Sequence, residues 1–222
     1  MNSSFDWRKY NADRNKEAVK INRFNLSSNF NYSEKGIYNH IRDIYALSLT
    51  ICKGKKKTKV LDYGGGLISQ SNLINKISLK NYNFTIYNPY IKKIKKKFLF
   101  NYSATDNIKK LNKEKFDLIY FGSCLQYVKN AELLIKLNFI VKSKFILITH
   151  TPLSFDAKSF VHEKQKNQKN LSQKIYTFDF IKKKLLKNKF TLVFKSTNDF
   201  KFSGLQNKKK HIKSMNLLFK KN

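Results

Sequence analysis

The sequence predicts an α/β protein, a three-layer sandwich whose sheet is mostly parallel and ends in an antiparallel strand. Apolar runs of strand length alternate with helix-like segments five times, an order typical of parallel sheets with helical crossovers. One run, at 60–66, enters three consecutive glycines, which allow the backbone to turn sharply beside a ligand. Two strand-like segments near the end of the chain are joined by a polar connection containing Gly204, so we expect them to pair antiparallel.

Ahead of the sheet, the chain divides into an arm and a helix. Residues 1–32 are polar and rich in Asn, and we expect a partly ordered N-terminal arm there. The α/β domain then covers 33–222. It begins with a helix at about 33–53, where apolar side chains recur on one face from Ile37 to Ile51. This helix should cover one face of the sheet.

The remaining strands and helices follow from apolar runs and from helical spacing. The strand-like runs are short and rich in aliphatic and aromatic residues, as in strands buried on both faces. Strands are expected at 60–62, 83–88, 98–101, 116–121 and 144–149, with the closing pair at 190–195 and 215–219. Helices are expected at 67–79, 92–97, 131–139 and 178–186. The polar, lysine-rich region around 153–174 is expected to be a long loop or lid.

The glycine turn indicates the kind of cofactor. A phosphate-binding loop would end in Gly-Lys-Ser or Gly-Lys-Thr, and a dinucleotide site would have Gly-x-Gly-x-x-Gly, but Ser69 stands three residues after Gly66. A cofactor without phosphate but with an amino-acid tail fits better, because Asp62 can bind an ammonium group. S-adenosylmethionine is such a cofactor. The alternative is a tight loop without a ligand, since turn glycines are common.

The charge of the chain admits two interpretations. The 222 residues include 46 Lys and Arg against 14 Asp and Glu, for a formal charge of +32, and polycations bind phosphate polymers. Only four of these cations are arginines, whereas sites that grip phosphate or read bases favour Arg. We therefore favour a solvated lysine surface that reflects composition, and keep nucleic-acid binding as the alternative.

Cysteine usage and hydropathy argue against disulfide-bonded, metal-binding, membrane-spanning and secreted classes of protein. Cys52 and Cys124 are far apart in the sequence, and neither belongs to a Cys-x-x-Cys pair, so we predict neither a disulfide nor a metal site. No run approaches the roughly 18 apolar residues that span a bilayer, and the first twenty residues contain no signal-peptide core. The expected location is the cytoplasm.

With the strand ends assembled, the chain resembles class I S-adenosylmethionine-dependent methyltransferases. Three segments carry the resemblance: Val60-Leu-Asp-Tyr-Gly-Gly-Gly66, Ser123-Cys-Leu-Gln-Tyr127 and Ile148-Thr-His-Thr-Pro152. More narrowly, the chain is similar to a small family of methyltransferases often encoded among bacterial surface-polysaccharide genes. The resemblance covers about 59–194 and implies a Rossmann-like methyltransferase fold that uses S-adenosylmethionine.

The resemblance also implies cofactor contacts at the ends of several strands. These contacts would come from Asp62, Gly64, Gly65, Gly66, Asn88, Asp106, Ser123, Leu125 and Gln126. Asn88 departs from the superfamily, which usually has an acid there for the ribose hydroxyls, and an uncharged amide makes weaker hydrogen bonds. For Leu125, simple packing in the core is the alternative.

The methyl acceptor is expected to be a small molecule or glycan, through a hydroxyl or amine of a sugar or nucleotide-linked sugar. Its nature follows from the resemblance alone. His150, at a strand end, is the first candidate for a base, although family members tend to have Arg there, which favours substrate binding; a purely structural role is the third possibility. Tyr127 is a second catalytic candidate. The alternatives are an RNA methyltransferase or a catalytically degenerate binding protein with the same fold.

Overall fold

A computed structural model provides the structure of the protein. It describes residues 8, 9, 12, 13, 16, 37–54, 56–65, 73, 77–89, 100–128, 130, 135–156, 158, 160–166, 168–198 and 211–222. Most of the arm expected at 1–32, most of the helix expected at 67–79, the segment 92–97 and Gly66 lie outside these residues. Among the helices of the described part, none is long and apolar enough to span a membrane.

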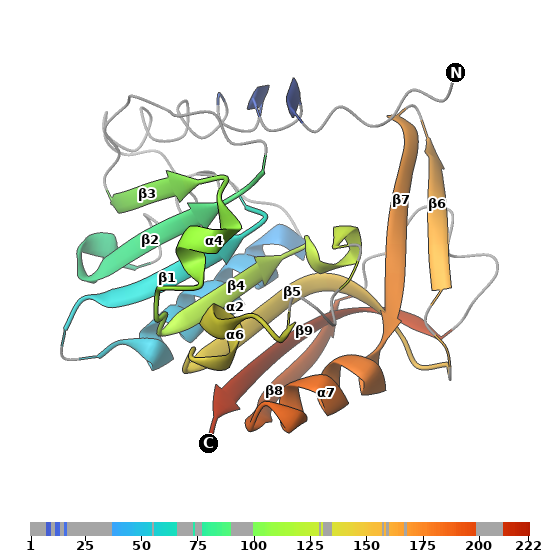
Figure 1. The fold of residues 1–222 in the computed structure, drawn as a ribbon. Helices are drawn as coiled ribbons and strands as arrows, with labels where there is room; N and C mark the ends of the chain where they lie inside the picture. Colours follow the sequence, from blue (N-terminus) through green and yellow to red (C-terminus); the bar gives the residue numbers. More distant parts are fainter. Residues whose placement is uncertain are drawn as a thin grey trace.

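One mixed sheet organises the molecule (Figure 1). Seven of its nine strands are β1 (Thr58–Tyr63), β2 (Tyr82–Tyr87), β3 (Asn101–Thr105), β4 (Leu118–Gly122), β5 (Phe145–Ser154), β8 (Phe190–Asn198) and β9 (Ile212–Lys221). The order β3-β2-β1-β4-β5 is parallel throughout. β9 then pairs antiparallel with β5, and β8 pairs antiparallel with β9. The predicted fold class is confirmed, including the antiparallel closing strand.

Helices cover both faces of the sheet and make three layers. On one face, α2 (Ile37–Cys52) buries Ile44, Tyr45 and Leu49 against the first three parallel strands and β4. On the other face, the core includes side chains of α6 (Asn138–Val141) and α7 (Phe178–Lys187). α7 begins where Thr177 accepts a hydrogen bond from the Phe180 N–H, the usual role of an N-cap threonine. The helices expected at 33–53 and 178–186 are therefore confirmed over their described residues.

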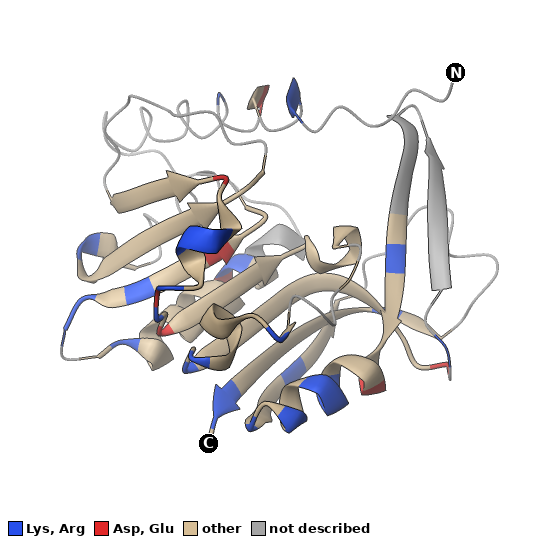
Figure 2. Ribbon diagram, viewed as in Figure 1, with Lys and Arg blue, Asp and Glu red and all other residues tan. Residues whose placement is uncertain are grey.

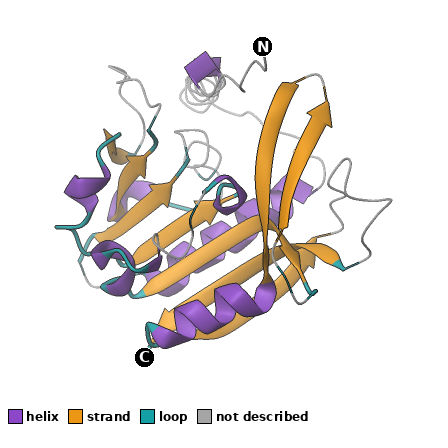
Figure 3. Ribbon diagram, turned by 45° about the vertical axis from the view of Figure 1, so that its right-hand side comes forward, coloured by secondary structure: helices purple, strands orange, loops and turns teal. Residues whose placement is uncertain are grey.

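The long loop expected at 153–174 was wrong, because the described residues of this region are mostly β-structure. β5 continues to Ser154, and β6 (Phe160–Lys166) and β7 (Gln168–Thr177) form an antiparallel hairpin that projects from the sheet (Figure 3). β7 also pairs with β5 in parallel at Leu153 and Ser154. Backbone hydrogen bonds between the two strands hold the hairpin, so a polar sequence can form it without the apolar alternation that would have identified it.

Two other boundaries differ from the expectation. β3 lies at Asn101–Thr105, not at 98–101, because an edge strand is half exposed and does not need the apolar run that the prediction followed. The helix expected at 131–139 is described only from residue 135, and α6 begins at Asn138.

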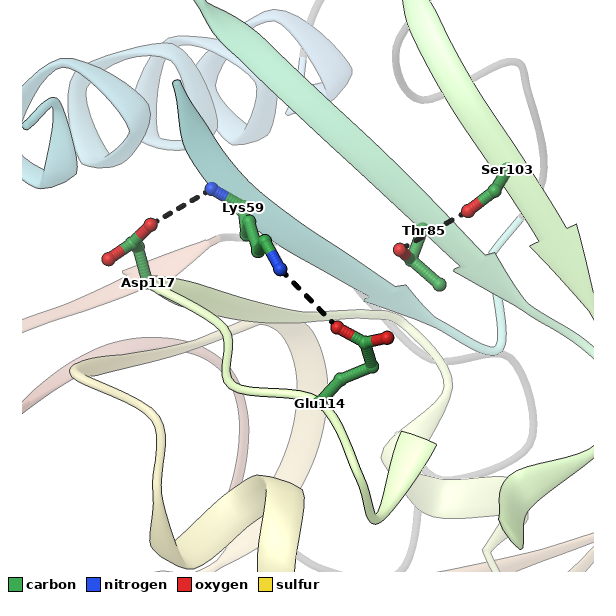
Figure 4. A network of polar contacts seen from close by, with 5 residues as sticks. All are labelled: Lys59, Thr85, Ser103, Glu114 and Asp117. Carbon is green, nitrogen blue, oxygen red and sulfur yellow. Dashed lines mark hydrogen bonds and ion pairs between the residues drawn. The ribbon is translucent and has the colours of Figure 1, made fainter. Parts of the chain in front are cut away.

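Ionic and hydrogen bonds join the strands at the edge where β1 and β4 begin. Asp117 accepts a hydrogen bond from the Lys59 backbone N–H at 2.9 Å, and Lys59 Nζ reaches Glu114 at 3.4 Å (Figure 4). Lys144 Nζ contacts Asp117 at 2.7 Å, which ties in the start of β5. These charges therefore serve the sheet and lie at the end opposite to the glycine turn.

Candidate functional site

The glycine turn after β1 requires glycine at two positions for two different reasons. Gly64 has φ +76°, a conformation that side chains disfavour, and a Cβ there would lie 2.8 Å from Cys124 Cβ. The Gly64 N–H donates to the Tyr87 carbonyl at 2.8 Å and so fixes the turn to the end of β2. At Gly65, a Cβ would overlap the Asp62 carboxylate. The turn therefore brings bare backbone over a buried carboxyl group.

Asp62 and Asn88 both lie close to Gly65 of this turn. Asp62 is completely buried and pairs in register with Tyr120 of β4, so both side chains face α2. Asn88 is also buried, and its Nδ2 donates to the Gly65 carbonyl at 3.1 Å. Its backbone N–H donates to Thr105 at the end of β3. The Asn88 amide thus joins the end of β2 to the glycine turn, a role that the sequence did not indicate.

The loop after β4 contributes the next group of predicted residues. Ser123 has φ +54°, and its N–H donates to the Thr149 carbonyl at 2.9 Å, which links the ends of β4 and β5. Gln126 is 2% exposed, and its Nε2 donates to the Ser123 carbonyl at 3.0 Å and to Ser123 Oγ at 3.3 Å. Gln126 Oε1 is buried without a hydrogen-bond partner among the described residues. It is the acceptor that a ligand N–H or O–H would satisfy.

Three other residues near these strand ends are a core leucine, an exposed acid and a buried thiol. Leu125 is buried in the core cluster that includes α6 and α7, so its side chain packs inside the protein. Asp106 is exposed at the end of β3, next to the Asn107 cap of a short helical turn. Cys124 donates through Sγ to the Tyr63 carbonyl at 2.8 Å, and burial, together with the nearby Asp62 charge, raises the pKa of its thiol. A buried thiol of raised pKa is a poor nucleophile.

His150 lies in β5 at a β-bulge, because β9 pairing skips from Ile148 to Thr151. Its φ is +49°, and its backbone N–H donates to Asn216 Oδ1 at 3.0 Å. Its Nδ1 lies 3.1 Å from Ser214 Oγ. The imidazole is 7% exposed, and burial lowers its pKa from 6.5 to about 4. At pH 7 the ring is therefore neutral.

Asn216 and Ser214, the hydrogen-bond partners of His150 described above, are polar and uncharged. Asn216 Nδ2 donates to Asn198 Oδ1 at 2.8 Å and to Ser196 Oγ at 3.0 Å, so β8 and β9 extend the hydrogen bonds that begin at His150. None of these residues was predicted as a site residue. They lie 46 to 66 positions from His150, and Asn and Ser are too common in this chain to stand out.

Tyr127 contacts the β6–β7 hairpin, which forms much of the region expected to be a loop or lid. Gln173 Nε2 of β7 donates to the Tyr127 hydroxyl at 3.1 Å, and the Tyr176 hydroxyl donates to the Val128 carbonyl at 2.7 Å. Gln173 and Tyr176 are both buried. The base of the hairpin is therefore hydrogen-bonded to the loop after β4, and Gln173 is a further candidate residue that a loop assignment could not identify.

Together, the structure gathers the ends of β1, β2, β4 and β5 into one site. Asp62, Gly64, Gly65, Asn88, Ser123 and Gln126 are connected through the contacts above, and Tyr127 and His150 flank them on the hairpin and β9 sides. Asp106 and the Leu125 side chain are not part of these contacts. Within the described part of the chain, no group of three or more His, Cys, Asp or Glu could hold a metal ion.

Solved structures of other proteins share this fold. No protein-family model matches the chain, and no curated protein sequence matches it. Among solved structures, magnesium protoporphyrin IX methyltransferase from Synechocystis is 12% identical over 100% of both chains, with a TM-score of 0.52. The 1,6-didemethyltoxoflavin-N1-methyltransferase of Burkholderia thailandensis is 11% identical over 100% of this chain and 93% of its own, with a TM-score of 0.52.

A third structure extends the same result. An S-adenosylmethionine-dependent methyltransferase from Methanosarcina mazei is 11% identical over 78% of this chain and 96% of its own, with a TM-score of 0.50. At these identities the likeness concerns the fold. The chain therefore has the class I fold of S-adenosylmethionine-dependent methyltransferases, as the sequence predicted.

Proposed function

We propose that this protein is an S-adenosylmethionine-dependent methyltransferase. The observation that carries the proposal is the turn at Gly64 and Gly65, which presents backbone without side chains directly over the buried Asp62 carboxylate. A buried carboxylate attracts a cation, and the amino-acid tail of S-adenosylmethionine carries an ammonium group. The comparisons support the same cofactor through the fold.

The residues present fit the rest of such a cofactor. The Gly64 and Gly65 backbone would approach its tail, and Gln126 Oε1 is a buried acceptor for one of its N–H or O–H groups. Asn88 would lie toward the ribose, although its Nδ2 already binds the Gly65 carbonyl. An acid at position 88 would face that carbonyl oxygen at about the same separation and repel it. Asn at position 88, where the superfamily usually has an acid, therefore suits this turn because its amide can donate to the Gly65 carbonyl.

When bound, S-adenosylmethionine supplies an electrophilic methyl group on a sulfonium. The protein must then align the acceptor with that methyl group and exclude water. His150, with a pKa of about 4, is too weak a base to remove a proton efficiently at pH 7. Its position supports acceptor binding instead, through a neutral ring that hydrogen-bonds.

We further propose that the acceptor is a neutral, hydroxyl-bearing small molecule or glycan such as a sugar. The described side chains that hydrogen-bond to one another on the hairpin and β9 sides are amides, hydroxyls and a neutral imidazole: Tyr127, His150, Gln173, Asn198, Ser214 and Asn216. Such groups hydrogen-bond to hydroxyls without demanding a charged partner. The resemblance that the three sequence segments suggest, to methyltransferases encoded among surface-polysaccharide genes, is a second reason for this proposal.

Isothermal titration with S-adenosylmethionine and with S-adenosylhomocysteine tests the proposal. We expect one site per chain, and Asp62→Asn should weaken binding by about tenfold because a charge-assisted hydrogen bond becomes a neutral one. Asp117→Asn at the opposite edge is the matched control and should bind like the parent protein. Absence of binding to the parent protein would refute the proposal and leave a binding protein with a methyltransferase fold.

A second test concerns the positive charge. In Figure 2 the Lys and Arg residues of the described part are spread over helices, loops and strands, as expected for a solvated surface. Binding to random-sequence RNA, followed by fluorescence anisotropy, should be weak and should fall steeply between about 50 and 200 mM salt. Tight binding to one RNA that persists at the higher salt concentration would contradict this and favour an RNA methyltransferase.

A further inference from the structure

The direction of α2 relative to the strands places its first turns beside the glycine turn. The Tyr82 hydroxyl, at the start of β2, donates to the Leu49 carbonyl near the end of α2 at 3.1 Å. One turn earlier in the helix, the Tyr45 ring stacks on Tyr120 with centroids 3.9 Å apart. α2 therefore runs opposite to the parallel strands, and its N-terminal half approaches their carboxyl ends.

Arg42 lies one turn of α2 beyond this stacked pair. Three residues of helix advance about 4.5 Å, and one strand residue spans about 3.3 Å, so Arg42 lies between one and two strand residues past the level of Tyr120. Tyr120 pairs in register with Asp62, so that level is the one of Tyr63 and Gly64. Arg42 is half-buried, whereas its neighbours His40 and Asp43 are exposed.

The Tyr120 hydroxyl connects Arg42 electrostatically with Asp62. Burial is the main cause that raises the pKa of Tyr120; the Asp62 charge raises it further, and the Arg42 charge lowers it. Both charges therefore act on one buried hydroxyl, which itself lies 3.0 Å from Thr149 Oγ1. The positions in helix and sheet and this electrostatic effect agree that Arg42 and Asp62 lie near the same end of β4.

We propose that Arg42 binds the carboxylate of the cofactor's amino-acid tail, while Asp62 binds its ammonium group. The inference rests on the proposed function. An amino-acid tail is a zwitterion, and a cation and an anion held beside bare glycine backbone match its two charges. Arg is suited to this role because its planar guanidinium donates two parallel hydrogen bonds to one carboxylate. Arg42 is the one arginine of α2, in a chain whose other cations are almost all lysines.

Two ligands distinguish carboxylate binding by Arg42 from a purely structural role of this residue. S-adenosylmethionine and decarboxylated S-adenosylmethionine differ only in the carboxylate, and each is titrated calorimetrically into the parent protein and into Arg42→Gln. We expect Arg42→Gln to weaken S-adenosylmethionine by about tenfold or more. The decarboxylated ligand should lose less than about threefold, because it has no carboxylate for Arg42 to bind.

Two further variants complete the experiment. Arg42→Lys should recover part of the affinity, since an ammonium keeps the charge but not the paired donors. Lys182→Gln removes an exposed cation of α7 and controls for the change in net charge; it should leave both ligands unaffected. Equal losses for both ligands in Arg42→Gln, or no loss for either, would overturn the role of Arg42 with the proposed function intact. No binding of either ligand to the parent protein would overturn both.

Discussion

Gly64→Ala should lower the free energy of unfolding by roughly 2 to 5 kcal/mol and abolish S-adenosylmethionine binding. The left-handed conformation at φ +76° costs a non-glycine residue about 1 to 2 kcal/mol. The new Cβ would also lie 2.8 Å from Cys124 Cβ, and overpacking of this kind costs about 1 to 3 kcal/mol. Relief of the contact would move the turn away from Cys124, and the backbone presented to the cofactor would move with it.

Urea denaturation measures the first effect and isothermal titration the second. Gly54→Ala is the matched control, because a Cβ at position 54 would meet nothing closer than the Lys56 carbonyl at 3.9 Å. It should change stability by no more than about 0.5 kcal/mol. Titration is performed on protein shown to be folded by circular dichroism, so that lost binding is not confused with unfolding. A folded Gly64→Ala variant with parental affinity would show that the cofactor does not bind at this turn.

Acidification should destabilise the protein through His150. Its pKa is about 4 in the folded protein and about 6.5 when unfolded, so the unfolded chain takes up the proton first. The stability contributed by the neutral ring is present above pH 6.5 and is lost as the pH falls toward 4, by at most roughly 3 kcal/mol. Ser214 and Asn216, which contact His150, are neutral and do not titrate over this range.

His150→Asn isolates this contribution. Asn tolerates positive φ better than most residues, so it should accept the bulge at +49°, and it carries no titratable group. Urea denaturation at pH 7, 6, 5 and 4 should therefore show a shallower loss of stability for His150→Asn than for the parent protein. His211→Asn, at an exposed histidine, should follow the parental curve. Identical curves for His150→Asn and the parent would mean that His150 is not buried neutral in the folded protein.

The sequence alone determined the fold class and the first half of the site. A buried parallel strand and a glycine turn are local features: the apolar run predicts β1, and three adjacent glycines predict the bend after Asp62. Because parallel strands end at one edge of a sheet, the strand order also brought Asn88, Ser123 and Gln126 to the same side. The antiparallel pairing of β8 and β9 followed from two strand-like segments joined by a polar connection.

The tertiary structure decided how the other half of the site is assembled. The β6–β7 hairpin depends on backbone pairing and has no apolar alternation. The contact of Gln173 with Tyr127 therefore could not be predicted from a pattern in the sequence. The bulge at His150 arises where the pairing of β9 with β5 shifts register. Burial keeps the ring neutral, and its hydrogen-bond partners come from residues far away in the chain. Helical periodicity predicted α2, but only the packing of Tyr45 on Tyr120 placed Arg42 level with the glycine turn. Local residue chemistry determines strands and turns, whereas relative positions depend on contacts that form only when the layers pack.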